Sequence, residues 1–287
     1  PGVVDRLGVG PTQVAAVNPR AVYCSISAFG QSGPYAQRVA HDLSIEAECG
    51  LVALNRGADG VPIIPCVPAA DMAGSLMALS GILMALLRRE KTGKGETIDI
   101  SMQDSLVSWM VNIVSPVFAE KRELVCDEER SLGGNAFYRI YQCSDGQYLT
   151  LGGAEMKFVT SLLGELGRPD LIDLCRLAPG RGQDPVRHFL EESFATSPRA
   201  HWESVLSRLN ICWAPVRGVK EGLESKHLAE RGMRIEFDGG DTHLGIPIRF
   251  ADEPGRVDPR APGLGEHTDE ILRELGYDED QRRKIAA

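Results

Sequence analysis

Residues 71–102 read DMAGSLMALSGILMALLRREKTGKGETIDISM, and this stretch decides the fold class. From Asp71 to about Glu90, apolar residues point in nearly every direction around a helix, which predicts a long, buried helix. The KTGKG segment at 91–95 then supplies the Lys and Gly residues that commonly end a helix. ETIDISM at 96–102 alternates between apolar and polar residues, so a strand is expected to follow directly.

The segments on either side of this stretch extend the same pattern. AVYCSIS at 21–27 is β-branched and aromatic, which is typical of a buried strand. Helical spacing places Leu43, Ala47, Leu51 and Leu54 on one face. The expected elements are a strand at 21–27, a Gly/Ser/Pro loop at 28–35, a helix at 42–54, a stiff Pro-containing loop at 55–70 and a helix at 103–118. Strand, helix and strand in succession predict an α/β architecture.

The second half of the chain predicts a smaller α+β domain. Its expected elements are a β-hairpin at 136–153 around Ser144-Asp145-Gly146, helices to about 208, a strand within 211–218, further strands at 234–239 and 244–250, and a polar helix near 267–285. The predicted organisation is a large α/β domain at 1–118, a linker at 119–135, a small α+β domain at 136–230 and a C-terminal segment at 231–287.

Composition narrows the class of protein. The net charge of −9, from 31 basic and 40 acidic residues, argues against nucleic acid as a main partner. The longest apolar-rich segment, Met72 to Leu87, contains two glycines and two serines, so we expect no membrane span. The cysteines show neither CxxC pairs nor metal-ligand spacing, which predicts reduced thiols and a cytoplasmic location; they stand at 24, 49, 66, 126, 143, 175 and 212.

Asp71 and His41 are the residues that could carry chemistry. Asp71 opens the long helix, where Asp is also a common capping residue, and the stiff loop before it would hold its carboxylate at the edge of a cleft. His41 stands beside Asp42 at the start of the preceding helix, and Asp42 alone could cap that helix. As a pair, the imidazole and the carboxylate each open a helix beside a Gly/Pro loop, which is an arrangement suited to acid–base chemistry.

Other candidates are weaker, because each also has an ordinary structural explanation. Arg6 could be a solvated surface residue, Glu155 a first-turn residue favoured by the helix dipole, and Gly133 and Gly134 parts of a linker. The sequence contains no GxSxG, HExxH or Walker motif, no GxGxxG after a strand, and no histidine cluster. We therefore expect no metal site.

Several segments together resemble family III CoA-transferases, the carnitine and bile-acid CoA-transferase group that also contains the α-methylacyl-CoA racemases. They are VYCSISAFGQSGPYA (22–36), AHDL (40–43), 69–106 with GILMALLRREKTGKGE as its most specific part, YQCSDGQYL (141–149), APVRGV (214–219) and GLGEHTDEILRELGY (263–277). The resemblance implies a partial Rossmann-like large domain, to which the C-terminal segment returns, and an interlocked homodimer. Family members begin with a further Rossmann-like segment, which carries much of the CoA nucleotide site and precedes the match.

The resemblance also implies roles for single residues. Asp71 falls on the catalytic aspartate, which is the nucleophile in transferases and one of two bases in racemases; His41 falls on the second base, 71 − 41 = 30 positions earlier. Arg6 and Glu155 fall on racemase active-site positions, with Glu155 supplied by the other subunit. Gly133 and Gly134 fall on a loop that shields the site, although GGNAF replaces the racemase's proline there. DISMQDS (99–105) is more similar to transferases.

Three functions remain open from the sequence. The first is α-proton transfer on an α-methylacyl-CoA by His41 and Asp71, with the CoA thioester as substrate and no separate cofactor. The second is CoA transfer between carboxylic acids through an anhydride on Asp71. The third is a non-catalytic subunit that completes a partner chain.

Overall fold

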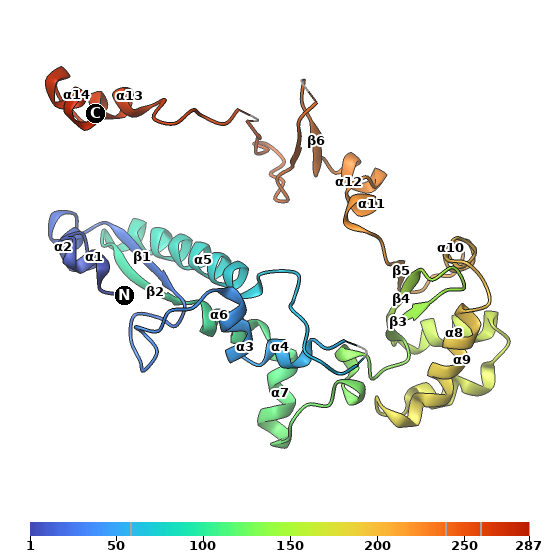
Figure 1. Cartoon of the computed structure of the whole chain (residues 1–287). Coiled ribbons are helices and arrows are strands. Elements are labelled where there is room, and N and C mark those ends of the chain that lie inside the picture. Colours follow the sequence, from blue (N-terminus) through green and yellow to red (C-terminus); the bar gives the residue numbers. More distant parts are fainter. Residues whose placement is uncertain (58, 239, 259, 287) are drawn as a thin grey trace. The chain divides into compact units, whose positions relative to one another are not determined.

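A computed structural model describes residues 1–57, 59–238, 240–258 and 260–286 (Figure 1). The chain divides into two compact units, Pro1–Pro215 and Val216–Ala287. The predicted segment boundaries at 119, 136 and 231 stay predictions. Each unit is described by itself below.

The first unit begins with a small parallel sheet, as the sequence predicts. Strand β1 (Val22–Ser27) pairs with β2 (Glu96–Ser101) in register Ser25 to Asp99. Two helices precede β1, namely α1 (Val3–Arg6) and α2 (Pro11–Val17). Parallel strands need a long crossover, and here it contains α3 (Asp42–Glu48), α4 (Leu51–Leu54) and α5 (Ala69–Thr92). The α/β class is therefore confirmed.

The predicted helix at 42–54 is two helices, so that prediction was wrong. Gly50 between α3 and α4 has φ +84°, a left-handed conformation that favours glycine and ends a helix. The buried face differs as well. Ile45 and Glu46 are buried on α3, whereas Leu43 is 42% exposed.

Helix α5 begins two residues before Asp71, and small residues form its packing face against β1, β2, α3 and α6. A Cβ on Gly74 would lie 3.0 Å from Met102 Cγ, and one on Gly81 would lie 3.4 Å from Ile98 Cγ2. The glycines predicted to interrupt an apolar run therefore let the helix approach its neighbours closely.

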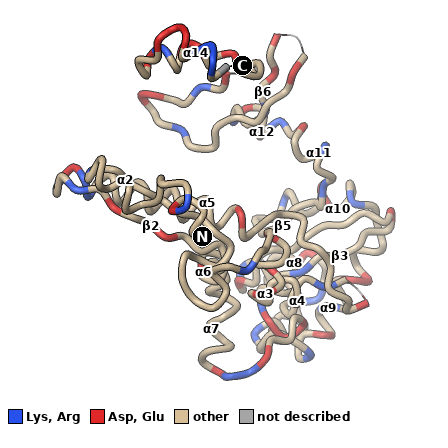
Figure 2. The backbone as a smooth tube through the Cα atoms, turned by 60° about the vertical axis from the view of Figure 1, so that its left-hand side comes forward, with Lys and Arg blue, Asp and Glu red and all other residues tan. Residues whose placement is uncertain are grey.

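The prediction that α5 is buried all round was wrong, because only the small-residue face is covered. The buried members are Ala70, Ala73, Gly74, Ala78 and Ala85. The larger side chains are exposed; they are Met72, Leu76, Met77, Leu79, Leu83, Met84 and Leu87. Between Asp71 and Arg88 the helix carries no charge (Figure 2).

By length and composition α5 could cross a membrane, and no other described helix could. From the sequence we expected no membrane span here, and by length and composition alone that expectation was wrong. The small-residue face of α5 packs on β1, β2, α3 and α6, and 28% of its most apolar window is buried.

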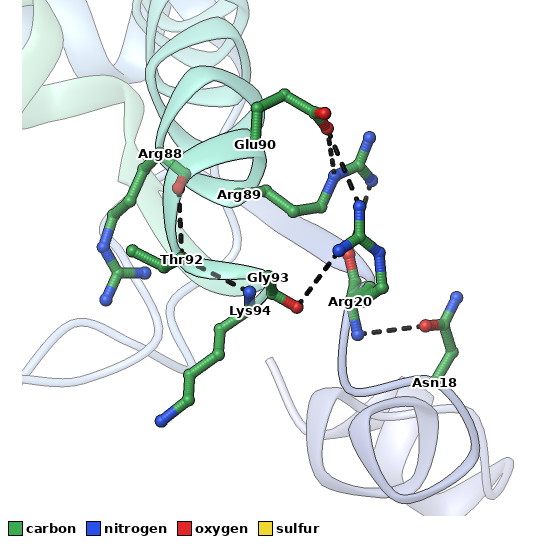
Figure 3. Close-up of polar contacts among 8 residues, drawn as sticks. All are labelled: Asn18, Arg20, Arg88, Arg89, Glu90, Thr92, Gly93 and Lys94. Atoms are coloured by element: carbon green, nitrogen blue, oxygen red, sulfur yellow. Dashed lines mark hydrogen bonds and ion pairs between the residues drawn. The ribbon is translucent and has the colours of Figure 1, made fainter.

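The C-terminal end of α5 is closed by its own glycine cap and by contacts from Arg20 (Figure 3). Gly93 ends the helix in the left-handed conformation at φ +70°, and its N–H donates to the Arg89 carbonyl. Arg20 donates to the Gly93 carbonyl at 3.4 Å and pairs with Glu90 at 3.7 Å. This end is thereby tied to the loop that precedes β1.

After β2, the predicted helix at 103–118 is also two helices, α6 (Met102–Trp109) and α7 (Val111–Glu120). Met110 at the break has ψ +19° and leaves the helical conformation. Ser101 caps α6 by accepting a hydrogen bond from the Asp104 N–H at 3.1 Å. The expected linker that follows contains two short 3₁₀ turns, η1 (Cys126–Glu128) and η2 (Arg130–Leu132).

The rest of the first unit has a well-packed core. The predicted hairpin is confirmed as β3 (Tyr138–Gln142) and β4 (Tyr148–Gly152), and β5 (Trp213–Pro215) pairs with β4. The surrounding helices are α8 (Met156–Glu165), η3 (Pro169–Arg176), η4 (Arg181–Gln183), α9 (Asp184–Phe194) and α10 (Arg199–Leu206). Trp202 packs edge-on against Phe194, and its indole N–H donates to the Phe194 carbonyl.

The second unit consists of short elements: α11 (Val219–Leu223), α12 (Lys226–Glu230), β6 (Arg234–Glu236), β7 (Thr242–Leu244), α13 (Thr268–Glu274) and α14 (Glu279–Ala286). Strand β7 ends where the predicted strand 244–250 was to begin, so that position was wrong. Gly239, in the other predicted strand, lies outside the described residues. The polar helix is divided at Gly276, where φ is +84°.

Candidate active site

The N-terminal end of α5 is capped by carboxylates from α3. Pro68 at the N-cap position has no side-chain hydrogen bond to offer. Asp42 Oδ1 instead accepts from the Ala70 N–H at 2.9 Å and the Asp71 N–H at 3.0 Å. Glu46 Oε1 accepts from the Ala69 N–H at 2.9 Å. Three of the first N–H groups, which have no partner within a helix, are thus satisfied.

These contacts bring the two main candidates into one neighbourhood. His41 is the N-cap residue of α3 and directly precedes Asp42. Asp71 is the third residue of α5, and its backbone is bonded to Asp42. Both candidate side chains are exposed. In the described part of the chain, neither a hydrogen bond nor an ion pair uses the Asp71 carboxylate, which is therefore open to a substrate.

Two structural expectations are corrected by this geometry. Asp71 lies within the first turn of α5 and is not its N-cap. Asp42 begins α3, and its carboxylate also caps α5, so it links two helices that are distant in the sequence.

Glu46 is the functional candidate that the sequence reasoning missed. Its side chain is 1% exposed, beside Ile45 in a small core that also contains Ala70 and Leu106. Burial raises the pKa of the Glu46 carboxyl; the Ala69 hydrogen bond lowers it, and the charges of Asp42 and Asp71 raise it. One signal was present in the sequence, since acidic residues at i and i+4 lie on the same helix face and repel each other unless they share a partner.

A cysteine nucleophile at this place is excluded by the state of Cys49, just beyond α3. Burial, followed by the charges of Glu48 and Asp104, raises the pKa of this thiol to about 11. The reactive thiolate is therefore scarce at neutral pH.

The other predicted residues lie elsewhere on the first unit. Arg6 is the exposed last residue of α1. Glu155 is the exposed N-cap residue of α8, and its carbonyl accepts from the Phe158 N–H. Among the described residues, hydrogen bonds and ion pairs do not link Arg6 or Glu155 to His41 or Asp71.

Gly133 and Gly134 have structural reasons to be glycine. Gly133 has φ +101°, and its carbonyl accepts from Arg139. A Cβ on Gly134 would lie 2.8 Å from the Asp127 carbonyl oxygen. Gly133 also lines a cavity of about 660 Å³ together with Tyr138, Arg139 and Thr150. The pair forms a tightly bonded turn beside a cavity.

Comparison with known proteins identifies the class. The family model described as CoA-transferase family III matches residues 1–268. The chain is 30% identical to the α-methylacyl-CoA racemase of Homo sapiens, over 98% of this chain and 74% of that protein. It is 29% identical to the acetyl-CoA:oxalate CoA-transferase of Acetobacter aceti, over 97% and 72%.

Solved structures agree with this match. A CaiB/BaiF family protein from Brucella suis superimposes with a TM-score of 0.75 at 28% identity, over 96% of this chain and 73% of that one. The predicted family fold and the prediction of an acyl-CoA enzyme are confirmed, which favours an enzyme over a non-catalytic subunit. The chain belongs to CoA-transferase family III, whose members include racemases and transferases that act on acyl-CoA thioesters.

Proposed function

We propose that this chain catalyses α-proton transfer on an α-methylacyl-CoA thioester, with His41 and Asp71 as the two acid–base groups. The observation that carries the proposal is the position of Asp42. Asp42 follows His41 in sequence and holds the Asp71 N–H at 3.0 Å, so an imidazole and a free carboxylate open two helices at the same place.

The reaction requires one proton acceptor and one proton donor. A base removes the hydrogen on the carbon next to the thioester carbonyl, which leaves an enolate. The second group returns a proton to the opposite face of that carbon, so atoms and charge balance without another reactant. Positioned acid–base groups typically contribute 10²–10⁴-fold each, roughly 3–5 kcal/mol of the barrier.

The enolate oxygen needs a donor other than the start of α5. The N–H groups of Ala69, Ala70 and Asp71 already donate to Glu46 and Asp42. The Met72 N–H donates to the Pro68 carbonyl. These backbone groups are therefore not free to donate to the enolate oxygen in this arrangement.

CoA transfer is the second candidate, and the free Asp71 carboxylate favours it. A carboxylate oxygen is already ionised at neutral pH and needs no base to activate it. It would attack the thioester carbonyl carbon, the C–S bond would break, and CoA thiolate would leave an acyl anhydride on Asp71. An acceptor acid then takes over the CoA while the first acyl group departs as its acid.

Solvent exchange separates the two reactions. In deuterated water without an acceptor acid, α-proton transfer incorporates deuterium at the α-carbon of an α-methylacyl-CoA, and both His41→Ala and Asp71→Ala abolish it. CoA transfer yields a hydroxylamine-trappable acyl adduct that Asp71→Ala alone removes. Deuterium uptake that persists in Asp71→Ala would overturn the assignment of Asp71. An Asp71 adduct without uptake would make the chain a transferase.

We further propose that the site is completed in an interlocked homodimer, with Glu155 contributed by the second subunit. Two observations support this: the uncovered apolar side of α5, and a Glu155 carboxylate that no described hydrogen bond or ion pair joins to His41 or Asp71 within the chain. Mixing Asp71→Ala subunits with Glu155→Ala subunits should then restore activity, because one site in each hybrid has both residues. Lack of recovery in a confirmed hybrid dimer would show that Glu155 acts within its own chain.

We also propose Arg6, Gly133 and Gly134 as contacts for the CoA part of the substrate. The cavity beside Gly133 supports a binding role for that turn. Arg6→Ala should raise KM for acyl-CoA more than it lowers kcat, as measured by initial rates. The cytoplasmic location stays a prediction.

A further inference from the structure

Glu46 has a position that the proposed reaction does not use. It is the one buried acidic side chain in the described part of the chain. Its carboxyl accepts a single hydrogen bond, from the Ala69 N–H, and no described ion pair involves it. A buried carboxylate without a cation is costly, so either a pairing charge or a proton must be present.

The charges around Glu46 do not supply the pairing charge. Asp42 lies one turn earlier on α3, and Asp71 lies in the first turn of α5. A helix N-terminus offers the equivalent of only about half a positive charge, whereas three carboxylates would meet there. One retained proton lowers this excess by one charge, and the raised pKa of Glu46, caused first by burial, is consistent with it.

The other described titratable groups packed around α3 supply no cation that pairs with Glu46. Helix α6 presents Asp104, α4 carries no titratable residue, and the thiol of Cys49 is itself protonated. Glu48 on α3 is neutralised by Arg38 at 3.0 Å. The nearby base is His41, whose side chain is exposed. Ionisation of Glu46 is therefore opposed by Asp42 on its own helix and by Asp71 on α5.

We propose that Glu46 is a positioning residue for Asp71. Its carboxyl group retains a proton, and this O–H donates a hydrogen bond to the Asp42 carboxylate. Both residues can then hold the first turn of α5. The inference rests on the proposed function of Asp71. Glu46 itself does not meet the substrate. It keeps Asp42 in place and spares the site a third negative charge.

The stability of Glu46→Gln against pH tests the proton without any activity assay. A glutamate has a pKa near about 4.3 when unfolded. If the folded pKa is higher, the native state holds one more proton between the two values, and wild-type stability falls as pH rises there. Gln is neutral and keeps both a donor and an acceptor. The urea midpoint of Glu46→Gln relative to wild type should therefore increase from pH 4.5 to 8.

The control is Glu48→Gln, a change on the exposed side of the same helix. Glu48 lies outside the core and is paired with Arg38, so this variant shows the effect of losing a carboxylate that is not buried; the inference requires a larger increase for Glu46→Gln than for Glu48→Gln. If the relative midpoint of Glu46→Gln stays flat or decreases with pH, Glu46 is ionised in the folded state and the inference is overturned.

Kinetics separate positioning from mere filling of space. Glu46→Gln should keep kcat within about threefold of wild type, whereas Glu46→Ala should lose on the order of 10-fold to 10²-fold, since it displaces Asp71. KM should change little in both. Equal losses in Gln and Ala would contradict a protonated Glu46. Failure of the reaction in the wild type would sink the proposed function while leaving the pH test of Glu46 intact.

Discussion

The two ends of α5 solve the same physical problem by different means. Each end of a helix leaves backbone groups without partners, and the helix dipole adds partial charge there. At the C-terminal end, Gly93 and Arg20 close the helix with a left-handed turn and surface contacts. At the N-terminal end, Asp42 and Glu46 reach across from α3.

The difference teaches how a capping arrangement becomes a candidate site. The C-terminal end is capped by its own Gly93, and the contacts from Arg20, 73 positions earlier, are exposed and only supplement that cap. The N-terminal end needs a carboxylate 28 positions earlier in the chain, and this brings His41 to the same place as Asp71. At that end, the same contacts that satisfy the N–H groups of α5 also bring His41 and Asp71 together.

The largest expected effect contrasts a carboxylate at each end. Asp71→Ala should reduce kcat by on the order of 10²–10⁴-fold, because it removes a group that meets the substrate. Glu90→Ala, at the other end, should leave kcat unchanged, because among the described residues its carboxylate pairs with exposed Arg20 and with Arg89, away from the site. Steady-state rates with an acyl-CoA substrate measure both. A rate loss in Glu90→Ala as large as that in Asp71→Ala would end the distinction.

Removal of the long-range cap should come next in size. Asp42→Ala leaves the Ala70 and Asp71 N–H groups without their acceptor, and we expect a loss of about 2–3 kcal/mol in the free energy of unfolding. Asp42→Asn is the matched variant, since its amide oxygen can still accept and should cost less. Urea denaturation gives both values. An unchanged midpoint in Asp42→Ala would mean that water replaces the cap at no cost.

The C-terminal cap should be sensitive to backbone conformation. Gly93→Ala places a Cβ on a residue at φ +70°, which costs about 1–2 kcal/mol. Gly164→Ala is the control, because it lies within α8 with open space around it and no positive φ, and it should stabilise or be neutral. Thermal unfolding distinguishes the two. Equal melting temperatures would show that the end of α5 frays without consequence.

The smallest effect is expected for the surface contacts at the C-terminal end. Arg20→Ala removes the pair with Glu90 and the bond to the Gly93 carbonyl, and should cost about 0–1 kcal/mol. The loss should shrink in high salt, because exposed charges are screened. A cost that matches Asp42→Ala and is unaffected by salt would remove the difference between the two ends.

The fold was predictable where short-range patterns dominate. β-branched and aromatic residues identified β1, alternation identified β2, the turn residues around Gly146 identified the hairpin, and the apolar run identified α5. Helix breaks were missed at Met110 and within 42–54, although Gly50 there could have marked one. Periodicity continues across a break, so it does not report a single residue that leaves the helical conformation.

The candidate site was predictable only in part. Asp71 and His41 stood out by residue type and position, and the resemblance gave them roles. Glu46 did not stand out, because an acidic residue in a short helix is normally solvated. Its burial depends on α5 and α6 packing over α3, which a sequence pattern does not contain.

The amino-acid sequence by itself determined strands β1 to β5, the long helix, the family and the two residues most suited to acid–base chemistry. These follow from interactions among residues a few positions apart and from recognisable motifs. Only the tertiary structure decided that Asp42 and Glu46 cap α5, that three of its first N–H groups are already occupied, and that its large apolar side chains stay uncovered. The physical reason is that a backbone N–H can donate to any acceptor that packing brings within about 3 Å, however distant that acceptor is in the chain.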